Sequence, residues 1–446
     1  MLLAHLALYR IGPDKPGPYS RALAPTAERV YNLCIYKNPI KRALSLYHVF
    51  EQEQIYMNSE QTDPQSVHAA VDAGRQQKAR EYSRIRRRLS LLGISISAIG
   101  ILLIFLLRID VLLRDALHAL SWQPLMGWFP LVIASYLLVL TVIYTIVTAP
   151  LSYYSGFVLP HRYGLSTMTL NGWLVDQAKS FVLGLVFEIL AIELIYLLLA
   201  TQPQLWWLWV ALILLLFSVL MANLAPVLLL PLFYKFSPLP DGDLKQRLVA
   251  LADRAHTRIQ GVFTMQMSNR TTAANAALMG LGNTRRIVLG DTMLDRYTPD
   301  EIEVVLAHEL GHHVHRDIWK LLVSQSLFTL VGLFLFNVCL QWVLGNLGRY
   351  HGLADPDTLP LLFVLTGIFG AIIAPLTNGY SRAIEYQADE YALTATGMVA
   401  PFKSAMTRLA NQNLAEIEPS PLVEFLFYDH PSIGKRLTHA EKFAGK

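Results

Sequence analysis

The chain has 446 residues, of which 53% are hydrophobic and only 16% are charged. Globular domains average about 45–50% apolar and about 25% charged residues, so this composition excludes an intrinsically disordered chain and argues against a soluble enzyme. The net charge of +4 is too small to indicate nucleic-acid binding. Two cysteines, Cys34 and Cys339, do not provide a disulfide framework or a cysteine-rich metal site. The composition predicts a polytopic membrane protein.

Residues 1–75 form a polar, proline-containing region to which the sequence assigns no function. Met1–Tyr9 is apolar, but it is too short to span a membrane and lacks a basic leader, so it does not resemble a signal peptide. The sequence is compatible with a peripheral helix around Ala27–Gln54.

Six stretches are apolar over roughly the 20 residues that a membrane helix needs. They are Leu91–Leu107, Trp128–Ala149, Phe181–Ala200, Leu205–Tyr234, Ile318–Leu344 and Pro360–Tyr380. The first four fall in residues 76–235 and the last two in residues 318–380. Pro226 and Pro231 interrupt the fourth stretch, so we expect it to kink or to leave the bilayer near its end.

Basic residues are concentrated on one side of the predicted membrane helices. Those before the first stretch are Arg75, Lys78, Arg80, Arg84, Arg86, Arg87 and Arg88. The loops on the other side hold only Arg108, Arg114 and Arg349. Because Lys and Arg favour the cytoplasmic side, we expect the N-terminus, the loop near 150–178, the insert 235–317 and the tail after 380 to face the cytoplasm.

The insert between the fourth and fifth membrane helices, residues 236–317, has the pattern of a small α/β domain. Short apolar runs predict strands at Val262–Met267, Asn275–Met279 and Ile287–Leu289. A helix is then predicted to begin with Thr298 as its N-cap, Pro299 at the first helical position and Glu301 completing a capping box.

This helix carries an H-E-x-x-H motif, His308-Glu309-Leu310-Gly311-His312. Histidines four residues apart point from one helix face, so both imidazoles can bind one Zn²⁺. Glu309, next to the first histidine, can then take a proton from the water that the metal activates. The alternative is a coincidental polar helix face, but the helical context that the motif requires is present.

Glu385 is the candidate for a third metal ligand, because catalytic zinc usually has three protein ligands and one open position. The motif ends just before the fifth membrane helix, and Glu385 follows just after the sixth, so two crossings return the chain to the same membrane face. Asp389 lies one helical turn further on, where it can accept a hydrogen bond from a ligating imidazole. The alternative is a solvated acidic helix face.

Several segments together resemble the CAAX prenyl protease family of integral-membrane zinc metallopeptidases. They occur in the family's order from about residue 78 to 440, and are Pro226–Leu239, Asn275-Ala276, Arg286–Leu289, the H-E-x-x-H motif, Glu385–Asp389, His430-Pro431 and Arg436-Leu437. The resemblance implies that His308, His312 and Glu385 bind zinc and that Glu309 is the general base.

The resemblance also implies that His430 and Arg436 help to stabilise the oxyanion or to align the site. From the residues alone, His430 would be interpreted as a surface histidine in a turn before a proline. Asn275, Ala276 and Ala277 are implied to belong to an edge strand that receives the substrate as an added strand. In that binding mode, main-chain hydrogen bonds capture an extended peptide.

Three features depart from the family's pattern. The family has seven membrane helices, but residues 1–75 contain no apolar segment that predicts the first of them. The tail has Ser432 after His430-Pro431, where the family often has a second proline. His313 and His315 extend the histidine cluster, but they point away from the ligand face and are predicted to be surface residues.

Glu188 and Glu193 lie inside the third predicted membrane helix, where charged side chains are costly and rarely face lipid. The family encloses a water-filled chamber, so carboxylates that line it are the favoured interpretation. A local polar pair and a misplaced span boundary are the alternatives. Gln325, Asn337 and Gln341 in the fifth predicted helix weakly indicate the same polar interior.

We therefore predict a mainly α, polytopic membrane protein with six to seven spans and a small cytoplasmic α/β zinc metalloprotease domain, completed by residues 381–446. The predicted activity is zinc-dependent cleavage near the C-terminus of a protein, prenylated if the resemblance extends to the substrate. A membrane-protein quality-control protease and a non-catalytic transporter or scaffold with a structural metal site are the alternatives. The predicted partners are a peptide or protein substrate and the lipid bilayer, but no nucleic acid. That bilayer would be the cell membrane in a prokaryote and the endoplasmic reticulum in a eukaryote.

Overall fold

The computed structural model describes residues 70–119, 129–280, 282–348, 350 and 352–445. All of these residues lie in the unit His68–Lys446. Met1–Tyr9 and the peripheral helix predicted around Ala27–Gln54 lie outside the described residues.

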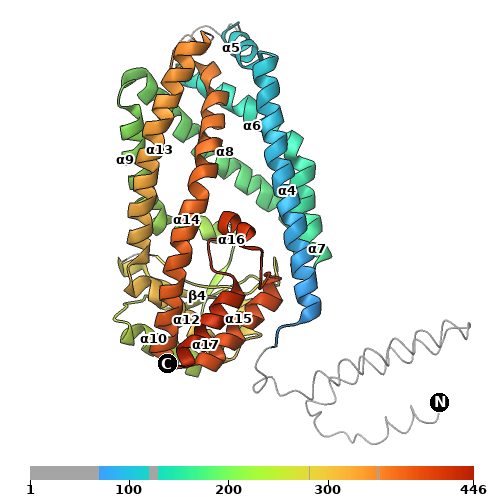
Figure 1. Cartoon of the computed structure of the whole chain (residues 1–446), viewed down its shortest axis with the longest axis vertical. Helices are drawn as coiled ribbons and strands as arrows, with labels where there is room; N and C mark the ends of the chain where they lie inside the picture. Colours follow the sequence, from blue (N-terminus) through green and yellow to red (C-terminus); the bar gives the residue numbers. More distant parts are fainter. Residues whose placement is uncertain (1–69, 120–128, 281, 349, 351, 446) are drawn as a thin grey trace, which may run out of the picture. The chain divides into compact units, whose positions relative to one another are not determined.

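Six helices in the described part of the chain are long and apolar enough to cross a membrane, as the sequence predicts (Figure 1). Their bounds are Ala73–Leu106, Pro130–Arg162, Leu170–Thr201, Trp206–Leu232, Asp317–Asn346 and Pro356–Thr396. Many of their large apolar side chains are exposed, and Leu106, Ile146, Val323 and Trp342 are each about two-thirds exposed. Because so large an apolar surface is costly in water, it indicates contact with lipid.

The N-terminal membrane half consists of α4 (Ala73–Leu106), α5 (Ile109–Ala119), α6 (Phe129–Tyr153), the π-helical turn η1 (Tyr154–Val158), α7 (Leu159–Arg162), α8 (Leu170–Thr201) and α9 (Trp206–Leu224). The first helix begins well before its apolar stretch, because Asp72 caps it by accepting a hydrogen bond from Arg75 N at 2.9 Å. The basic stretch therefore belongs to the same helix as the first membrane span.

Prolines interrupt the fourth membrane helix near its end, where the sequence predicts a kink. Regular α-helix stops at Leu224, and a π-helical turn, η2 (Ala225–Leu229), and a 3₁₀ turn, η3 (Leu230–Leu232), follow. Pro226 and Pro231 lie in these two turns. A proline has no N–H to donate within a helix, which explains why the regular hydrogen-bond pattern breaks here.

The segment after the fourth membrane helix contains β1 (Phe236–Pro238), α10 (Asp243–Arg254), β2 (Val262–Met265), β3 (Ala276–Met279), η4 (Gly282–Thr284), β4 (Arg286–Gly290), α11 (Asp291–Leu294) and α12 (Pro299–Val314). The C-terminal part contains α13 (Asp317–Leu347), η5 (Pro356–Thr358), α14 (Leu359–Thr396), α15 (Val399–Asn413), α16 (Pro421–Phe427) and α17 (Ile433–Ala444).

The four described strands form one sheet in the order β1-β2-β4-β3. The central pair, β2 and β4, is parallel with Val262 opposite Ile287, and the two outer pairs are antiparallel. Strands are confirmed in all three predicted places, and β3 lies at one edge of the sheet. Three-residue β1 was not predicted, because so short a segment ending in a proline has no strand pattern of its own.

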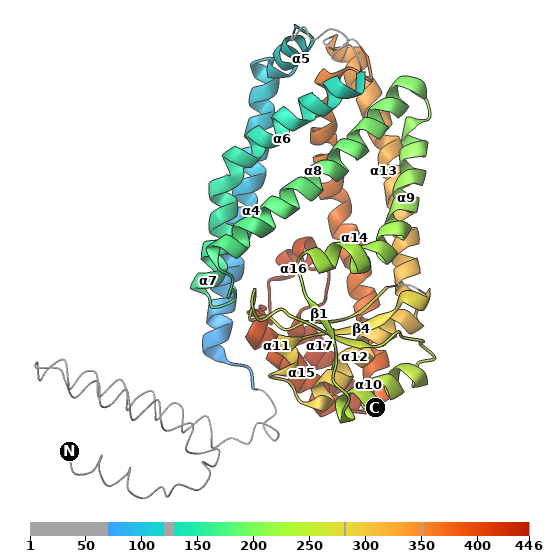
Figure 2. The same ribbon diagram turned by 180° about the vertical axis from the view of Figure 1, so that it is seen from behind.

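The sheet and α12 share one hydrophobic core with α10, α14, α15 and α17, and both views place these elements together in the lower part of the unit (Figure 2). Its fully or almost fully buried members include Leu248, Leu251, Ile287, Leu289, Leu306 and Phe402. Burying one such side chain stabilises the fold by about 1.5–3 kcal/mol. This core holds α12 on several sides, so the motif lies on a rigid element.

The N-terminus of α12 has the predicted capping box. Thr298 Oγ1 accepts a hydrogen bond from Glu301 N, and Glu301 Oε2 accepts one from Thr298 N at 2.9 Å. Glu301 is also buried. Ser404 and Arg408 on α15 donate hydrogen bonds to its other oxygen, Oε1. The cap therefore also ties α12 to α15.

The helices α12 and α14 approach each other closely at Gly311. A Cβ atom added there would lie 3.1 Å from Ala388 Cα and 3.2 Å from Ala388 O. Ala388 is fully buried. Small residues on both helices therefore permit a close crossing, and the metal-binding candidates His308, His312 and Glu385 lie within about one helical turn of it.

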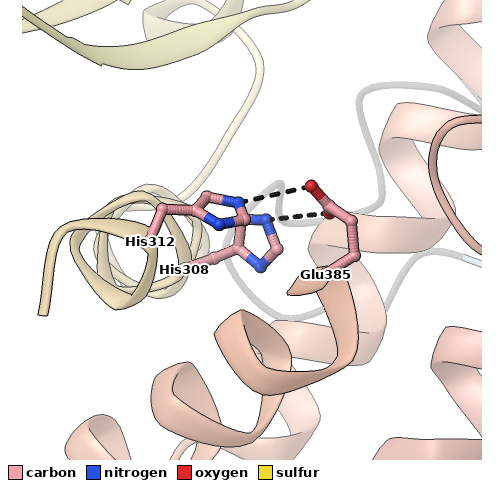
Figure 3. Close-up of side chains that lie close together, drawn as sticks. All are labelled: His308, His312 and Glu385. Atoms are coloured by element: carbon pink, nitrogen blue, oxygen red, sulfur yellow. Dashed lines mark ion pairs between the residues drawn. The ribbon is translucent and has the colours of Figure 1, made fainter. Parts of the chain in front are cut away.

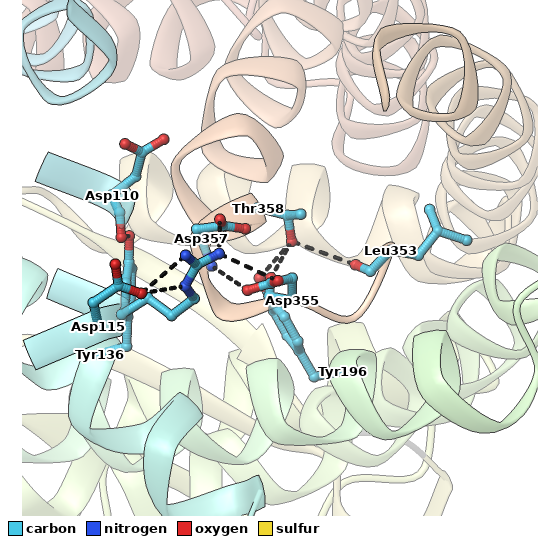
Figure 4. A network of polar contacts seen from close by, with 9 residues as sticks. Asp110, Asp115, Tyr136, Tyr196, Leu353, Asp355, Asp357 and Thr358 are labelled. Carbon is cyan, nitrogen blue, oxygen red and sulfur yellow. Dashed lines mark hydrogen bonds and ion pairs between the residues drawn. The ribbon is translucent and has the colours of Figure 1, made fainter. Parts of the chain in front are cut away.

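A polar network lies where α5 meets η5 and the start of α14 (Figure 4). Arg114 pairs with Asp357 at 2.7 Å, with Asp115 at 2.9 Å and with Asp355 at 3.5 Å. Thr358 Oγ1 donates to the Asp355 carbonyl and lies 2.9 Å from the Tyr196 hydroxyl on α8. The network joins the short helix α5 to the membrane helix α8 and to the start of the sixth membrane helix.

The polar residues predicted inside the membrane helices lie where the sequence placed them. Glu188 and Glu193 are half-buried within the continuous helix α8. Glu188 accepts a hydrogen bond from Thr141 at 3.3 Å, and Asn337 accepts one from Trp206 at 2.8 Å. These bonds satisfy local polar groups, and the chamber-lining role stays a prediction.

The close crossing at Gly311 predicts the effect of a larger side chain. In Gly311→Val, the new atoms meet the Ala388 backbone, which moves only if α12 and α14 separate. We expect a loss of about 1–3 kcal/mol in unfolding free energy and a marked loss of bound metal, measured by thermal unfolding and elemental analysis. Gly370→Val on α14 is the control, since a Cβ there meets nothing within 4 Å. Unchanged metal content in Gly311→Val would contradict this role of the crossing.

Candidate metal centre

Three side chains converge at the crossing of α12 and α14 (Figure 3). The Nε2 atoms of His308 and His312 each lie 3.3 Å from an oxygen of Glu385. One ligand atom from each of the three residues lies within 4.8 Å of the others. The structure thus brings together the three ligands that the sequence predicted. Two histidines and one glutamate form a donor set used by catalytic zinc sites.

The other ring nitrogens of both histidines face carboxylates. His308 Nδ1 lies 2.9 Å from Asp389 Oδ1, and His312 Nδ1 lies 3.0 Å from Asp317 Oδ2. A carboxylate at this distance accepts the Nδ1 proton, which leaves the Nε2 lone pair pointing toward Glu385. Carboxylates that orient the ligating rings in this way are common in metal sites.

Glu385 provides a test of whether a cation fits this site. Its Oε2 atom is buried and makes no hydrogen bond of good geometry among the described residues, although His308 Nε2 lies 3.3 Å away. An oxygen of a buried carboxylate needs a proton donor or a cation, because an unpartnered charge is costly inside a protein. The two Nε2 lone pairs and the two Glu385 oxygens therefore fit a metal ion between them.

Arg436 on α17 lies behind the first histidine. Its Nε atom donates to Asp389 Oδ2 at 2.9 Å, and its Nη2 atom lies 2.5 Å from Asp389 Oδ1 and 3.2 Å from His308 Nδ1. The guanidinium is buried and makes a two-bond pair with the carboxylate, a geometry that fixes both groups. In this arrangement, Arg436 is placed to align His308 through Asp389.

His430 approaches the site from the loop between α16 and α17. Its Nε2 atom lies 3.2 Å from Glu385 Oε1, and its Nδ1 atom lies 2.9 Å from Asp429 Oδ1. About half of its side chain is exposed, so it faces the open side of the cluster. The position agrees with the role implied by the resemblance and differs from that of a turn histidine remote from the cluster.

Charge around the cluster shifts the pKa values of its basic groups. Burial and the Arg436 guanidinium act to lower the pKa of His308, but the carboxylates of Asp389 and Glu385 outweigh them and raise it to about 9. The hydrogen bond to Asp429, and then the charge of Glu385, raise the pKa of His430. Without a metal, the His308 ring is therefore positively charged at neutral pH, with a proton on each nitrogen. Metal binding must displace the proton on Nε2.

The predicted substrate strand lies at the edge of the sheet next to α12. Ala276 and Ala277 belong to β3, and Asn275 precedes it and is exposed. Gly290 N on β4 donates to the Asn275 carbonyl at 2.8 Å, so pairing with β4 extends one residue beyond the strand. In the sheet order, the other side of β3 has no neighbouring strand among the described residues.

A pocket of about 740 Å³ opens beside His312. It is lined by side chains from the end of α10, the start of β4 and the junction of α12 with α13. Its titratable lining residues are all basic, and they are His256, Arg285, His312, His313 and Arg316. The pocket thus places two arginines, Arg285 and Arg316, on the side of His312.

Sequence reasoning missed Asp317 and misjudged two histidines. Asp317 is buried at the start of α13, and no local motif marks a residue after the helix end as the partner of His312. His313 and His315 lie outside the ligand cluster as predicted, but both are half-buried, not at the surface. His315 is half-buried because its ring packs against the Tyr391 ring on α14.

Two family models match nearly the whole described chain. The model described as "Peptidase family M48" matches residues 238–444. The model described as "CAAX prenyl protease N-terminal, five membrane helices" matches residues 52–235. Four of the six candidate membrane helices fall in the second match, which begins in residues that the structure does not describe.

Similar proteins occur in bacteria and eukaryotes. "Uncharacterized metalloprotease YhfN" of Bacillus subtilis is 31% identical over 69% of this chain and 72% of its own length. "CAAX prenyl protease 1" of Saccharomyces cerevisiae is 32% identical over 66% of this chain and 68% of its own length. The crystal structure of S. mikatae Ste24p is 28% identical and superimposes with a TM-score of 0.74 over 83% of this chain and 90% of that chain.

These matches agree with the membrane helices, the H-E-x-x-H helix and the convergent cluster. A metallopeptidase of this family requires a metal, and the His308, His312 and Glu385 group is compatible with one. The chain therefore belongs to the CAAX prenyl protease family and is a multi-pass membrane metalloendopeptidase.

Proposed function

We propose that the protein is a zinc-dependent endopeptidase that cleaves a peptide bond near the C-terminus of a prenylated protein. The observation that carries this proposal is the convergence of His308, His312 and Glu385, with Glu309 next to the first histidine on the same helix. The three residues would hold Zn²⁺, which fits their two nitrogen donors and one oxygen donor.

Glu309 is the proposed general base. When bound, zinc would polarise the scissile carbonyl and acidify a water molecule. Glu309 takes the proton of the attacking water and later delivers it to the leaving amine nitrogen, so one carboxylate serves as base and then as acid. Its place beside His308 on α12 keeps it close to the ligand cluster.

His430, Arg436 and Asp389 are proposed to complete the site. His430 stands on the open side, 3.2 Å from Glu385, where its N–H can donate to the oxyanion that forms on the substrate. Arg436 and Asp389 form a buried ion pair that fixes the orientation of His308. Their proposed contribution is alignment, since both groups contact the Nδ1 atom of the His308 ring.

The substrate is proposed to bind as an added strand along Asn275, Ala276 and Ala277. An edge strand offers unpaired N–H and C=O groups, and these recognise the backbone of an extended peptide without reading its side chains. The prenylated substrate is supported by the printed names of the yeast and human relatives, "CAAX prenyl protease 1" and "CAAX prenyl protease 1 homolog".

Two other functions are weighed against this one. A quality-control protease would use the same centre on misfolded membrane proteins. A comparison of cleavage rates for prenylated and unfolded substrates distinguishes the two functions. A transporter or scaffold with a structural metal would normally have a site closed by four protein ligands. The cluster among the described residues has three, which favours an open catalytic position.

The active site is proposed to face the cytoplasm. The basic residues that begin α4 and the α12 helix lie on the same side of the predicted membrane helices, and basic residues favour the cytoplasmic side. The membrane would be the cell membrane in a prokaryote and the endoplasmic reticulum in a eukaryote.

The activity is tested with purified protein and three substrates. These are a prenylated C-terminal peptide, the same peptide without the lipid, and an unfolded membrane protein. We expect zinc-dependent cleavage of the prenylated peptide that chelator abolishes. In Glu309→Gln, the rate should fall about 10²–10⁴-fold, while elemental analysis finds the same zinc content. Full activity in this variant would refute the proposed base.

The pattern among the substrates separates the alternatives. Preference for the prenylated peptide supports CAAX processing, and preference for the unfolded protein supports quality control. Cleavage of none of them by zinc-loaded wild-type protein would favour the non-catalytic alternative.

The carboxylate behind His312 predicts a defect in metal affinity. In Asp317→Asn, the uncharged amide orients the ring less strongly and makes it a weaker donor, so zinc should bind about 10–100-fold more weakly. Competition with a chelator of known affinity measures this change. Asp241→Asn is the control, because Asp241 is highly exposed and pairs only with nearby Lys245 among its described contacts. Equal affinity in both variants would contradict the role of Asp317.

Membrane orientation is tested by cysteine labelling. Asp241 in the insert and Gln204 in the loop between α8 and α9 are both exposed and lie on opposite sides of the predicted bilayer. In a background without Cys34 and Cys339, we expect a membrane-impermeant maleimide added to intact cells or right-side-out vesicles to label Gln204→Cys. Asp241→Cys should be labelled only after permeabilisation. The reverse pattern would place the metal centre outside the cytoplasm.

A further inference from the structure

The free side of the edge strand offers backbone groups at every second residue. In an antiparallel pair, the N–H and C=O of one residue point to the same side, and those of the next residue point to the other side. The bond from Gly290 N to the Asn275 carbonyl shows that Asn275 faces β4. Ala274, Ala276 and Leu278 therefore face the free side, where the proposed substrate would pair.

Ala274 already has partners on that side. Asn413 is the last residue of α15, and its Oδ1 atom accepts a hydrogen bond of 2.9 Å from Ala274 N. Its Nδ2 atom donates to the Ala274 carbonyl at 3.1 Å. One amide side chain thus makes both hydrogen bonds that a residue of a neighbouring strand would make, and it occupies this position of the edge.

Further contacts hold Asn413 in place. The neighbouring Gln412 donates from Nε2 to the Thr272 carbonyl at 2.7 Å, so two consecutive side chains bind the segment before β3. Gln76 on α4 in turn donates to the Ala415 carbonyl and accepts from Ile417 N, both at 3.1 Å. The end of α15 is therefore anchored on both sides, and the amide has little freedom to move away from the strand.

We propose that Asn413 closes one end of the substrate-binding strand and limits how many substrate residues fit on one side of the scissile bond. This inference rests on the proposed function, because it concerns the strand on which the substrate would bind. A bound peptide pairs with Ala276 and Leu278, and its pairing stops where Asn413 occupies Ala274. Asn413 is thus a positioning and specificity residue.

The chemistry of the substrate follows from this closure. An extended peptide has to end or bend away at the Ala274 end of β3, because no free N–H or C=O remains there to pair with it. A chain terminus meets this requirement without a bend. The closed end therefore favours substrates cut near one end of the chain over those cut in the middle of a long extended segment.

The test uses zinc-loaded full-length protein and peptides lengthened one residue at a time on each side of the scissile bond. Binding is measured in the Glu309→Gln background and kcat/KM in the active protein. We expect additional residues on one side to weaken binding and kcat/KM about tenfold beyond a fixed length, the effect of losing hydrogen bonds at a buried site. On the other side, longer peptides should bind equally well.

Asn413→Ala frees Ala274 and should remove this length limit while lowering kcat/KM for the short peptides. Asn413→Asp retains the acceptor for Ala274 N but has no donor for its carbonyl, so an intermediate length profile is expected. Asn411→Ala is a matched control on the same helix. Asn411 also accepts from one backbone N–H and donates to one backbone carbonyl, but these belong to Asp72 and Ala70 before α4.

An unchanged length profile in both Asn413 variants would overturn the proposal, and so would an equal change in Asn411→Ala. Thermal unfolding and zinc content identify a variant that has lost its fold. The length profile of the Asn413 variant that still folds then tests the proposal. The failure of the proposed function looks different, because the zinc-loaded wild-type protein would then cleave no peptide of the series.

Discussion

The close contact between α12 and α14 is the constraint on which the metal centre depends. Gly311 and Ala388 are small enough for the two helix backbones to approach, and the ligand candidates flank this contact. A wider crossing would separate the His308 and His312 rings from Glu385. Because α14 runs without interruption from its apolar stretch to Thr396, the position of Glu385 is determined by the packing of a membrane helix.

Each histidine of the cluster is oriented from a different part of the chain. Asp389 on α14 holds His308, Asp317 at the start of α13 holds His312, and Arg436 on α17 fixes Asp389. Both membrane helices that follow the motif thus contribute to the centre directly. The apolar helices therefore anchor the protein and also bring together the metal-binding candidates and the carboxylates that orient both histidines.

Binding and chemistry depend on separate elements. The proposed chemistry belongs to α12, α14 and α17, whereas the proposed substrate strand is β3, whose end is held by Asn413 on α15. The tie from α15 to α4 through Gln76 connects this strand to the first described membrane helix. The shared hydrophobic core of the sheet, α12, α15 and α17 holds both groups of elements in register.

The sequence by itself determined the features that depend on local physics. Twenty apolar residues make a membrane helix, prolines break one, and Thr298 with Glu301 starts α12, because these effects act within a few helical turns. His308, Glu309 and His312 follow from helical spacing, and Glu385 from counting membrane crossings. Only the tertiary structure decided the partners Asp317 and Asn413 and the short strand β1. Their roles come from contacts between segments far apart in the chain, and a single carboxylate or amide has no sequence pattern that marks its partner.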